Sequence, residues 1–255
     1  MISEILLIQQ QISEIPPLAL IAEGTALLVY TYLTMNLASK WKSTRKNATR
    51  NLFLSFAFYF LAVLMLFSTK TTNFLTGDQI DISTVGINIG YAFSLLGNVF
   101  LYYFTEDIFF DEDTKITNLR EVITLANGIT LGFLMIFIFQ LQSAPFLELP
   151  GEYISIHLLI WHVIVSTVGF LILLVKAFQA TINSNTRLAR GGFFMISLTA
   201  VFEILVFVFF FLDRFSPEGY TYWYFIAWLT ASIAGLSSMI GYLMPNWFKR
   251  LLGGN

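Results

Sequence analysis

Four ionisable side chains lie inside long apolar stretches of this sequence, and they are its clearest candidates for chemistry. They are Glu23, His157, His162 and Glu203. An ionisable side chain surrounded by hydrocarbon is unfavourable unless it is paired, hydrated or neutralised. Residues of this kind therefore bind ligands, transfer protons or join helices by hydrogen bonds, and their positions must be known before a role is assigned.

Two interpretations of Glu203 stay open. In the first, its carboxyl group hydrogen-bonds an interior amide such as Asn98 and holds helices together. In the second, it contacts a ligand, a proton or an ion. Thr199 lies one helical turn away and could supply a hydroxyl group on the same face. Under both interpretations we expect Glu203 to face the protein interior and to be neutral or paired.

The two histidines differ in their surroundings. His162 is balanced between a structural role and contact with a ligand, whereas His157 lies near the end of its apolar stretch and fits an interfacial residue. A zinc site made of His157, His162 and Glu23 is an alternative, but a five-residue spacing turns the two rings about 140° apart on a helix. We therefore expect neither a metal ion nor another cofactor.

The composition indicates which elements position these residues. The chain has 255 residues, of which 56% are hydrophobic and 12% are charged, whereas roughly 25% of an ordinary soluble domain is charged. Runs of roughly 20 apolar residues match the thickness of a bilayer core. Segments of about 10 alternating residues, as in a membrane β-barrel, are not the pattern seen here. Seven runs are found, at residues 17–37, 52–69, 85–104, 123–141, 154–175, 193–212 and 223–243.

The distribution of basic residues predicts the orientation, because Lys and Arg accumulate in cytoplasmic loops. Loops on one side hold twelve: Lys40, Lys42, Arg45, Lys46, Arg50, Lys115, Arg120, Lys176, Arg187, Arg190, Lys249 and Arg250. The other side holds Lys70 and Arg214. The sequence thus predicts an all-α membrane protein, a seven-transmembrane helix bundle with its N-terminus outside and its C-terminus in the cytoplasm.

The predicted organisation has three parts. Residues 1–15 form an outer interfacial amphipathic segment, residues 16–244 form the seven-helix bundle, and residues 245–255 form a cytoplasmic amphipathic tail. At about 1.5 Å of helical rise per residue, Glu23 and His162 lie about 10 Å below the outer surface and Glu203 lies near the midplane. We therefore expect Glu23, His162 and Glu203 to line one outward-facing cavity.

Three further patterns are interpreted as features of helix packing or of the membrane interface. Small residues four positions apart predict close helix contacts at Gly86 and Gly90, at Gly128 and Gly132, and at Ser237 and Gly241. Residues 207–211 are rich in Phe and are expected to fill lipid-facing and interhelical space. An aromatic belt is expected near the outer end of the seventh run, from Tyr220, Tyr222, Trp223, Tyr224 and Trp228.

Several known chemistries do not fit the residues. Residues 223–243 contain no Lys, which a retinal Schiff base in the seventh helix would need, and the two histidines are too few for a three-histidine zinc hydrolase. The acidic triplet at residues 111–113 has no second cluster and fits a solvated loop rather than a magnesium site. The absence of Cys excludes disulfides and thiolate metal ligands. No feature of the sequence indicates binding to nucleic acid.

The seventh run ends in LMPNWFKRLL, in which Pro245 stops the helix and an amphipathic segment follows. With this exit, basic inner loops and seven spans, the chain resembles the seven-helix sensor regions that precede histidine kinases in prokaryotes. The resemblance implies a multi-pass protein of the cell membrane that binds a ligand between its helices and signals to a cytoplasmic partner. Such sensors continue into an output domain, whereas this sequence stops at Asn255.

The leading functional hypothesis is therefore a receptor whose ligand contacts are Glu23, Asn98, His162 and Glu203, without a catalytic residue. Two alternatives stay open. One is a transporter or proton-coupled protein that uses Glu203, Glu23 and His162 as a relay, although transporters often show internal repeats and interrupted helices that are not evident here. The other is a non-catalytic subunit of a membrane complex.

Overall fold

The protein is a bundle of long helices. The computed structural model describes residues 15–76, 81–110, 118–143, 156–214 and 220–253, without the side chains of 81–85, 137–143 and 156–158. Among these residues there is no strand, and seven helices are long and apolar enough to cross a membrane, as predicted. The elements are α2 (Pro17–Thr44), α3 (Asn47–Thr76), α4 (Asp81–Phe109), α5 (Leu119–Ser143), α6 (Ile156–Asn183), α7 (Arg187–Arg214), α8 (Tyr222–Ser238), the π-helical segment η2 (Met239–Leu243) and α9 (Asn246–Leu251).

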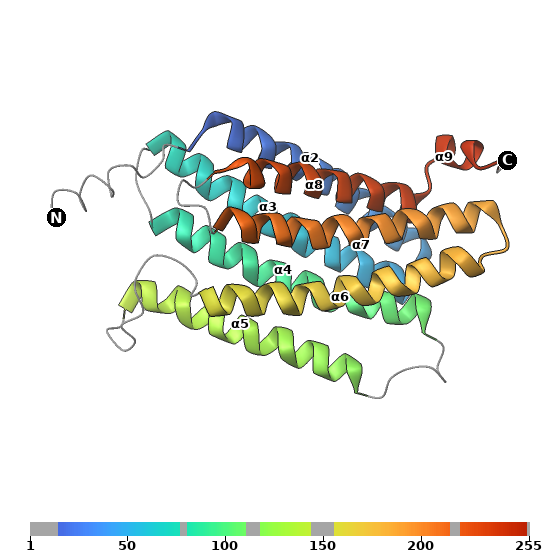
Figure 1. Ribbon diagram of the computed structural model, residues 1–255, viewed down its shortest axis with the longest axis horizontal. Helices are drawn as coiled ribbons and strands as arrows, with labels where there is room; N and C mark the ends of the chain where they lie inside the picture. The colour runs from blue at the N-terminus through green and yellow to red at the C-terminus, as the bar shows by residue number, and fades with distance from the viewer. Residues whose placement is uncertain (1–14, 77–80, 111–117, 144–155, 215–219, 254–255) are drawn as a thin grey trace.

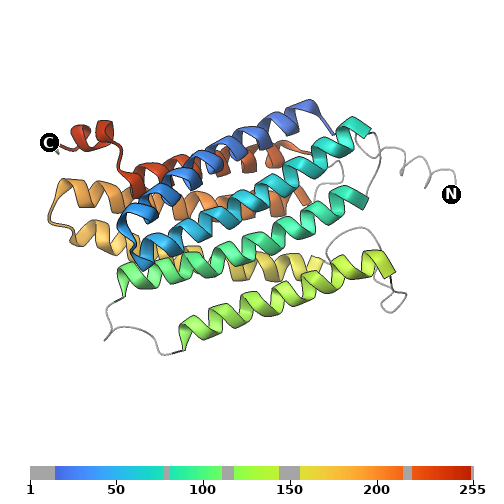
Figure 2. The same ribbon diagram turned by 180° about the vertical axis from the view of Figure 1, so that it is seen from behind.

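Successive long helices run in opposite directions along one common axis (Figure 1). The helix α2 begins at one end of the bundle, here called the N-terminal end, and α9 lies at the opposite, C-terminal end. Both views place α5 at the edge, where it packs against α4 and α6 (Figure 2). The other six long helices surround the interior.

Each helix buries one face and leaves another apolar. In α2 the buried positions include Ala26, Tyr30 and Leu33, which recur every three or four residues, whereas Leu28 on another face is 72% exposed. In α5, Leu125 is 64% exposed. Water would not solvate such surfaces, but lipid chains do, so the exposed faces fit a bilayer environment.

Close helix contact occurs at some of the predicted small-residue pairs and not at others. A Cβ atom added to Gly86 would lie 2.1 Å from the Thr69 hydroxyl oxygen, and one added to Gly241 would lie 3.2 Å from the carbonyl oxygen of Gly192. A Cβ added to Gly128 or Gly132 would meet nothing within 4 Å. The prediction of close packing at Gly128 and Gly132 is wrong, because no described helix packs against that face of α5.

The C-terminal end of the bundle has an irregular exit. The last turn of the seventh span widens into the π-helical segment Met239–Leu243, and Met244 adopts a left-handed conformation with φ 46°. Pro245 then precedes α9, in which Trp247 is 55% exposed and Phe248 is buried. Residues 1–14 of the predicted outer segment lie outside the described part of the chain.

Candidate functional site

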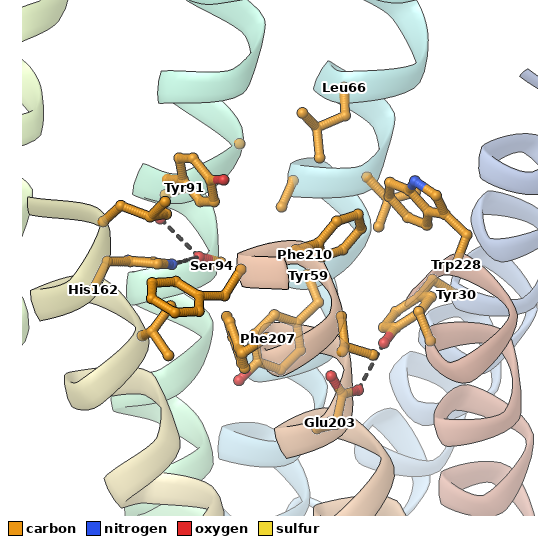
Figure 3. A pocket seen from close by; sticks show the side chains of 18 residues that line it. Tyr30, Tyr59, Leu66, Tyr91, Ser94, His162, Glu203, Phe207, Phe210 and Trp228 are labelled. Atoms are coloured by element: carbon orange, nitrogen blue, oxygen red, sulfur yellow. Dashed lines mark hydrogen bonds between the residues drawn. The ribbon is translucent and has the colours of Figure 1, made fainter. Parts of the chain in front are cut away.

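The interior contains a cavity of about 100 Å³ between α2, α3, α4, α6, α7 and α8. Its lining residues lie mainly in the first halves of α4, α6 and α8 and the second halves of α3 and α7. Because successive helices alternate in direction, these positions all fall toward the N-terminal end of the bundle. The lining consists of Tyr30, Tyr59, Ala62, Val63, Leu66, Gly90, Tyr91, Ser94, Leu159, His162, Val163, Glu203, Val206, Phe207, Phe210, Phe211, Trp228 and Ala231 (Figure 3).

Glu203 forms part of the cavity wall near the middle of α7. It is 6% exposed, and its Oε1 accepts a 2.7 Å hydrogen bond from the Tyr30 hydroxyl (Figure 3). The carboxyl group therefore lies in the interior, where the sequence placed it. Its observed partner, Tyr30, is neither Asn98 nor Thr199, the two partners that the sequence suggested. The Thr199 hydroxyl donates to the Met195 carbonyl on its own helix and accepts a hydrogen bond from Ser238.

Asn98 belongs to a separate polar group that joins three helices. Its Oδ1 accepts a 2.7 Å hydrogen bond from the Tyr59 hydroxyl, and its Nδ2 donates a 2.8 Å hydrogen bond to the Ser166 hydroxyl. Asn98 is 2% exposed and is not part of the cavity lining. Through Tyr59, which does line the cavity, it links the wall to α4 and α6.

His162 forms the opposite part of the wall from α6. Its side chain is 1% exposed, and its Nε2 lies 3.4 Å from the Ser94 hydroxyl oxygen. The ring packs at 4.8 Å from the ring of Tyr91 and 5.9 Å from that of Phe207, measured between centroids. His162 and Glu203 thus contact the same cavity, in agreement with their expected proximity.

Glu23 lies elsewhere, in a buried ion pair near the N-terminal end of α2. Its Oε1 is 2.5 Å from the Lys70 ammonium nitrogen and also accepts a hydrogen bond from the Tyr224 hydroxyl. Neither Glu23 nor Lys70 lines the cavity. The assignment of Lys70 to an outer loop is wrong, because α3 continues to Thr76 and the Lys70 side chain is 8% exposed.

The expected aromatic belt divides into two groups. Tyr222 is 86% exposed and Trp223 is 40% exposed, which fits an interfacial position. Tyr224 and Trp228 are buried, the first against the Glu23–Lys70 pair and the second in the cavity wall. The sequence pattern missed this difference, although the four-residue spacing of Tyr224 and Trp228 would place both on one face of a helix.

Within the described residues, no group of three or more His, Asp or Glu side chains could hold a metal ion. The side chain of His157 and the acidic residues 111–113 lie outside them, so the zinc and magnesium alternatives stay untested. The chemistry available in the cavity is that of one carboxyl group, one imidazole and several aromatic faces. Searches of family models, curated proteins and solved structures found no match to this chain.

Proposed function

We propose that this protein is a seven-helix membrane receptor that binds a small molecule in the cavity and signals to a cytoplasmic partner. The supporting observation is the cavity itself, in which one buried carboxyl group and one imidazole are held among apolar side chains from six helices. Ligand sites in proteins have this character, since they combine apolar walls with a few polar groups that orient the ligand.

The proposed orientation places the cavity in the outer half of the bundle. Eleven of the twelve basic residues counted above are described, and the helix directions bring these eleven to the C-terminal end. The positive-inside rule assigns that end to the cytoplasm. The membrane would then be the cell membrane, with the N-terminus outside, and a ligand would reach the cavity from the outer side.

The packing offers a route for the signal. A ligand that contacts six helices shifts the equilibrium between their arrangements if it binds one arrangement better than another. At the C-terminal end, α7 and η2 approach closely at Gly192 and Gly241, and the Lys40 ammonium group donates a 2.5 Å hydrogen bond to the Tyr242 carbonyl. Movement of α8 would therefore pass through η2 to α9 and the basic surface offered to the partner.

The test uses three molecules of similar size and different charge: tert-butylammonium, tert-butanol and isobutyrate. The chain contains no Cys, so Lys46→Cys and Asn185→Cys together can carry two spin labels at the C-terminal end. We expect at least one of the three molecules to shift the measured distance between the labels by about 1–2 Å, the size of helix shifts in switching proteins. Their binding is measured by titration calorimetry on the protein in lipid nanodiscs.

A cavity-filling variant provides the control. Ala231 lines the cavity and is 4% exposed, whereas Leu229 on the same helix is 62% exposed. Ala231→Phe should abolish both the binding and the distance change, and Leu229→Phe should preserve both. The proposal is wrong if none of the three molecules binds, if Ala231→Phe does not weaken binding, or if binding leaves the distance unchanged.

A proton-coupled transporter is the second candidate, and the polar group around Asn98 favours it. Tyr59, Asn98 and Ser166 form a continuous hydrogen-bonded series that begins at the cavity wall and crosses to α6. A pH-sensitive dye inside liposomes distinguishes the two functions. A transporter would acidify or alkalinise the lumen when a pH gradient or substrate is applied, and a receptor would not.

A further inference from the structure

The aromatic side chains around Glu203 give the cavity a particular ligand chemistry. Seven of the 18 lining residues are Tyr, Phe or Trp. Phe207 and Phe210 lie one and two turns from Glu203 on the same face of α7 and line the same cavity, and Figure 3 shows the Glu203 carboxyl group joined to the Tyr30 hydroxyl by a hydrogen bond. Trp228 packs against Phe210 with 5.3 Å between ring centroids. One carboxyl group thus shares a cavity with several aromatic side chains.

The ionisable groups of the described wall are the Glu203 carboxyl group and the His162 imidazole, which lie on opposite sides of the cavity. Among the described residues that line the cavity there is one carboxyl group and no Lys or Arg. The Tyr30 hydroxyl donates a 2.7 Å hydrogen bond to Oε1 of Glu203. A cation at this place would pair with Glu203, and pairing is one of the ways in which an ionisable side chain is stabilised inside a membrane protein.

The same chain already holds an ammonium group in this way. The Lys70 nitrogen lies 2.5 Å from a carboxylate oxygen of Glu23, 4.5 Å from the centroid of the Tyr224 ring and 5.4 Å from that of Tyr220. Aromatic faces attract cations within about 6 Å of the ring centroid. The Glu23 site and the cavity share a carboxyl group, a tyrosine hydroxyl bonded to it and further rings, but the cavity contributes no cation of its own.

We infer that the cavity binds a small organic ammonium ion, with Glu203 as the counter-ion and Tyr30, Phe207, Phe210 and Trp228 as the aromatic faces. This inference rests on the proposed ligand-binding function and adds the class of ligand. The cavity volume of about 100 Å³ restricts the ligand to a compact molecule, since an engineered cavity of about 150 Å³ takes benzene.

The experiment compares tert-butylammonium with tert-butanol, which has nearly the same shape and no charge. Both are titrated into the protein in nanodiscs by calorimetry. We expect tert-butylammonium to bind and tert-butanol to bind at least about 10-fold more weakly. Glu203→Gln keeps an oxygen acceptor for Tyr30 but removes the charge, and it should weaken tert-butylammonium binding about 30-fold or more.

Matched variants separate the aromatic contribution from general damage. Phe210→Leu should weaken tert-butylammonium binding by about 3- to 30-fold, the range of cation–π interactions. Phe194→Leu changes a 46% exposed residue of the same helix and should have no effect. Melting temperature and gel-filtration profile show whether each variant is folded, and Phe210→Leu provides the test if Glu203→Gln does not fold.

The outcomes distinguish this inference from the proposed function. If tert-butanol or isobutyrate binds as tightly as tert-butylammonium and Ala231→Phe abolishes that binding, the cavity is a ligand site but the ammonium assignment is wrong. If folded Glu203→Gln or Phe210→Leu binds tert-butylammonium as the wild type does, the assignment is also wrong. If none of the three molecules binds, both proposals fail.

Discussion

At the scale of single residues, the buried ion pair of Glu23 and Lys70 requires the fold to keep both charged groups together. Both side chains are almost completely buried, with 0% and 8% exposure, and they come from different helices. Removing water from two charges is costly, so the pair is stable only while each charge keeps its partner. Tyr224 donates a further hydrogen bond to Glu23 and thereby ties α8 to α2 and α3.

We predict that Glu23→Gln and Lys70→Met each lower the free energy of unfolding by about 3–5 kcal/mol, because each leaves one buried charge without its partner. The double variant should lose clearly less than the sum of the two single losses, since it removes both charges. The measurement is a double-mutant cycle from SDS unfolding curves. Lys46→Met, at an exposed position, is the control and should change little.

Simple additivity of the two losses would contradict this prediction. It would show that the two side chains act independently, despite the 2.5 Å separation of their charged atoms.

The sequence predicted the interior positions of Glu203 and His162 but missed the interior position of Lys70. Glu203 and His162 could be placed near the cavity because an ionisable group amid apolar residues is driven inward and its depth follows from helical rise. The buried position of Lys70 could not be predicted, because hydropathy decreases at this residue and the decrease resembles the end of a span. The signal that could have identified it is Glu23, which lies at a similar depth on the neighbouring helix and needs a cation.

Trp228 and Phe210 illustrate a second limit at this scale. Aromatic residues are common in lipid-facing, interfacial and interior positions of membrane helices, and composition alone does not separate these positions. Only the packing of α7 against α8 shows that these two rings meet at 5.3 Å and border the cavity. Tyr222, at 86% exposure, belongs to the interfacial group that the pattern anticipates.

At the scale of elements, pairs of small residues with the same spacing lie in different surroundings. Gly241 lies where η2 meets α7, and an added Cβ would be 3.1 Å from the Ile196 backbone nitrogen and 3.2 Å from the Gly192 oxygen. Backbone atoms cannot move aside as a flexible side chain can. Gly132 on α5 has open space instead, with no atom within 4 Å of an added Cβ.

We predict that Gly241→Ala destabilises the protein by about 1–3 kcal/mol, as over-packing of a tight contact does. Gly132→Ala should be neutral or stabilising by up to about 1 kcal/mol, because alanine loses less conformational freedom than glycine on folding and its Cβ meets no neighbouring atom. Melting temperatures in one detergent, measured side by side, test both. Equal losses in the two variants would contradict the helix contacts described here.

The seven spans were predictable because each apolar run coincides largely with one long helix, the last run with α8 and η2 together. Most helices extend beyond their runs, since hydropathy marks the lipid-embedded part and not the continuation of backbone hydrogen bonding beyond it. The run at 52–69, for example, lies in a helix that extends from Asn47 to Thr76. The π-helical segment Met239–Leu243, which contacts α7 at Gly241, was not predicted, because hydropathy marks apolar runs and does not indicate the hydrogen-bond pattern within a helix.

At the scale of the whole molecule, the two ends of the bundle differ in charge and in their distance from the cavity. The C-terminal end has basic residues on α2, α3, α5, α6, α7 and α9, and the cavity lies toward the N-terminal end. If basic loops stay in the cytoplasm, the same asymmetry that orients the protein in the membrane would also determine from which side the proposed ligand reaches the cavity. Orientation therefore decides whether the proposed receptor reports on the outside of the cell.

The last prediction tests this orientation in intact cells. Because the chain has no Cys, single cysteines can be introduced at Lys46 and Asn185 at the C-terminal end, and at Leu75 and Tyr222 at the N-terminal end. All four positions are exposed. A membrane-impermeant maleimide should label Leu75→Cys and Tyr222→Cys in intact cells, and should label Lys46→Cys and Asn185→Cys only after the membrane is opened. The reverse pattern would place the cavity in the cytoplasmic half and would exclude a receptor that binds its ligand from outside. Labelling of sites from both ends in intact cells would contradict a bundle that spans the membrane with one fixed orientation.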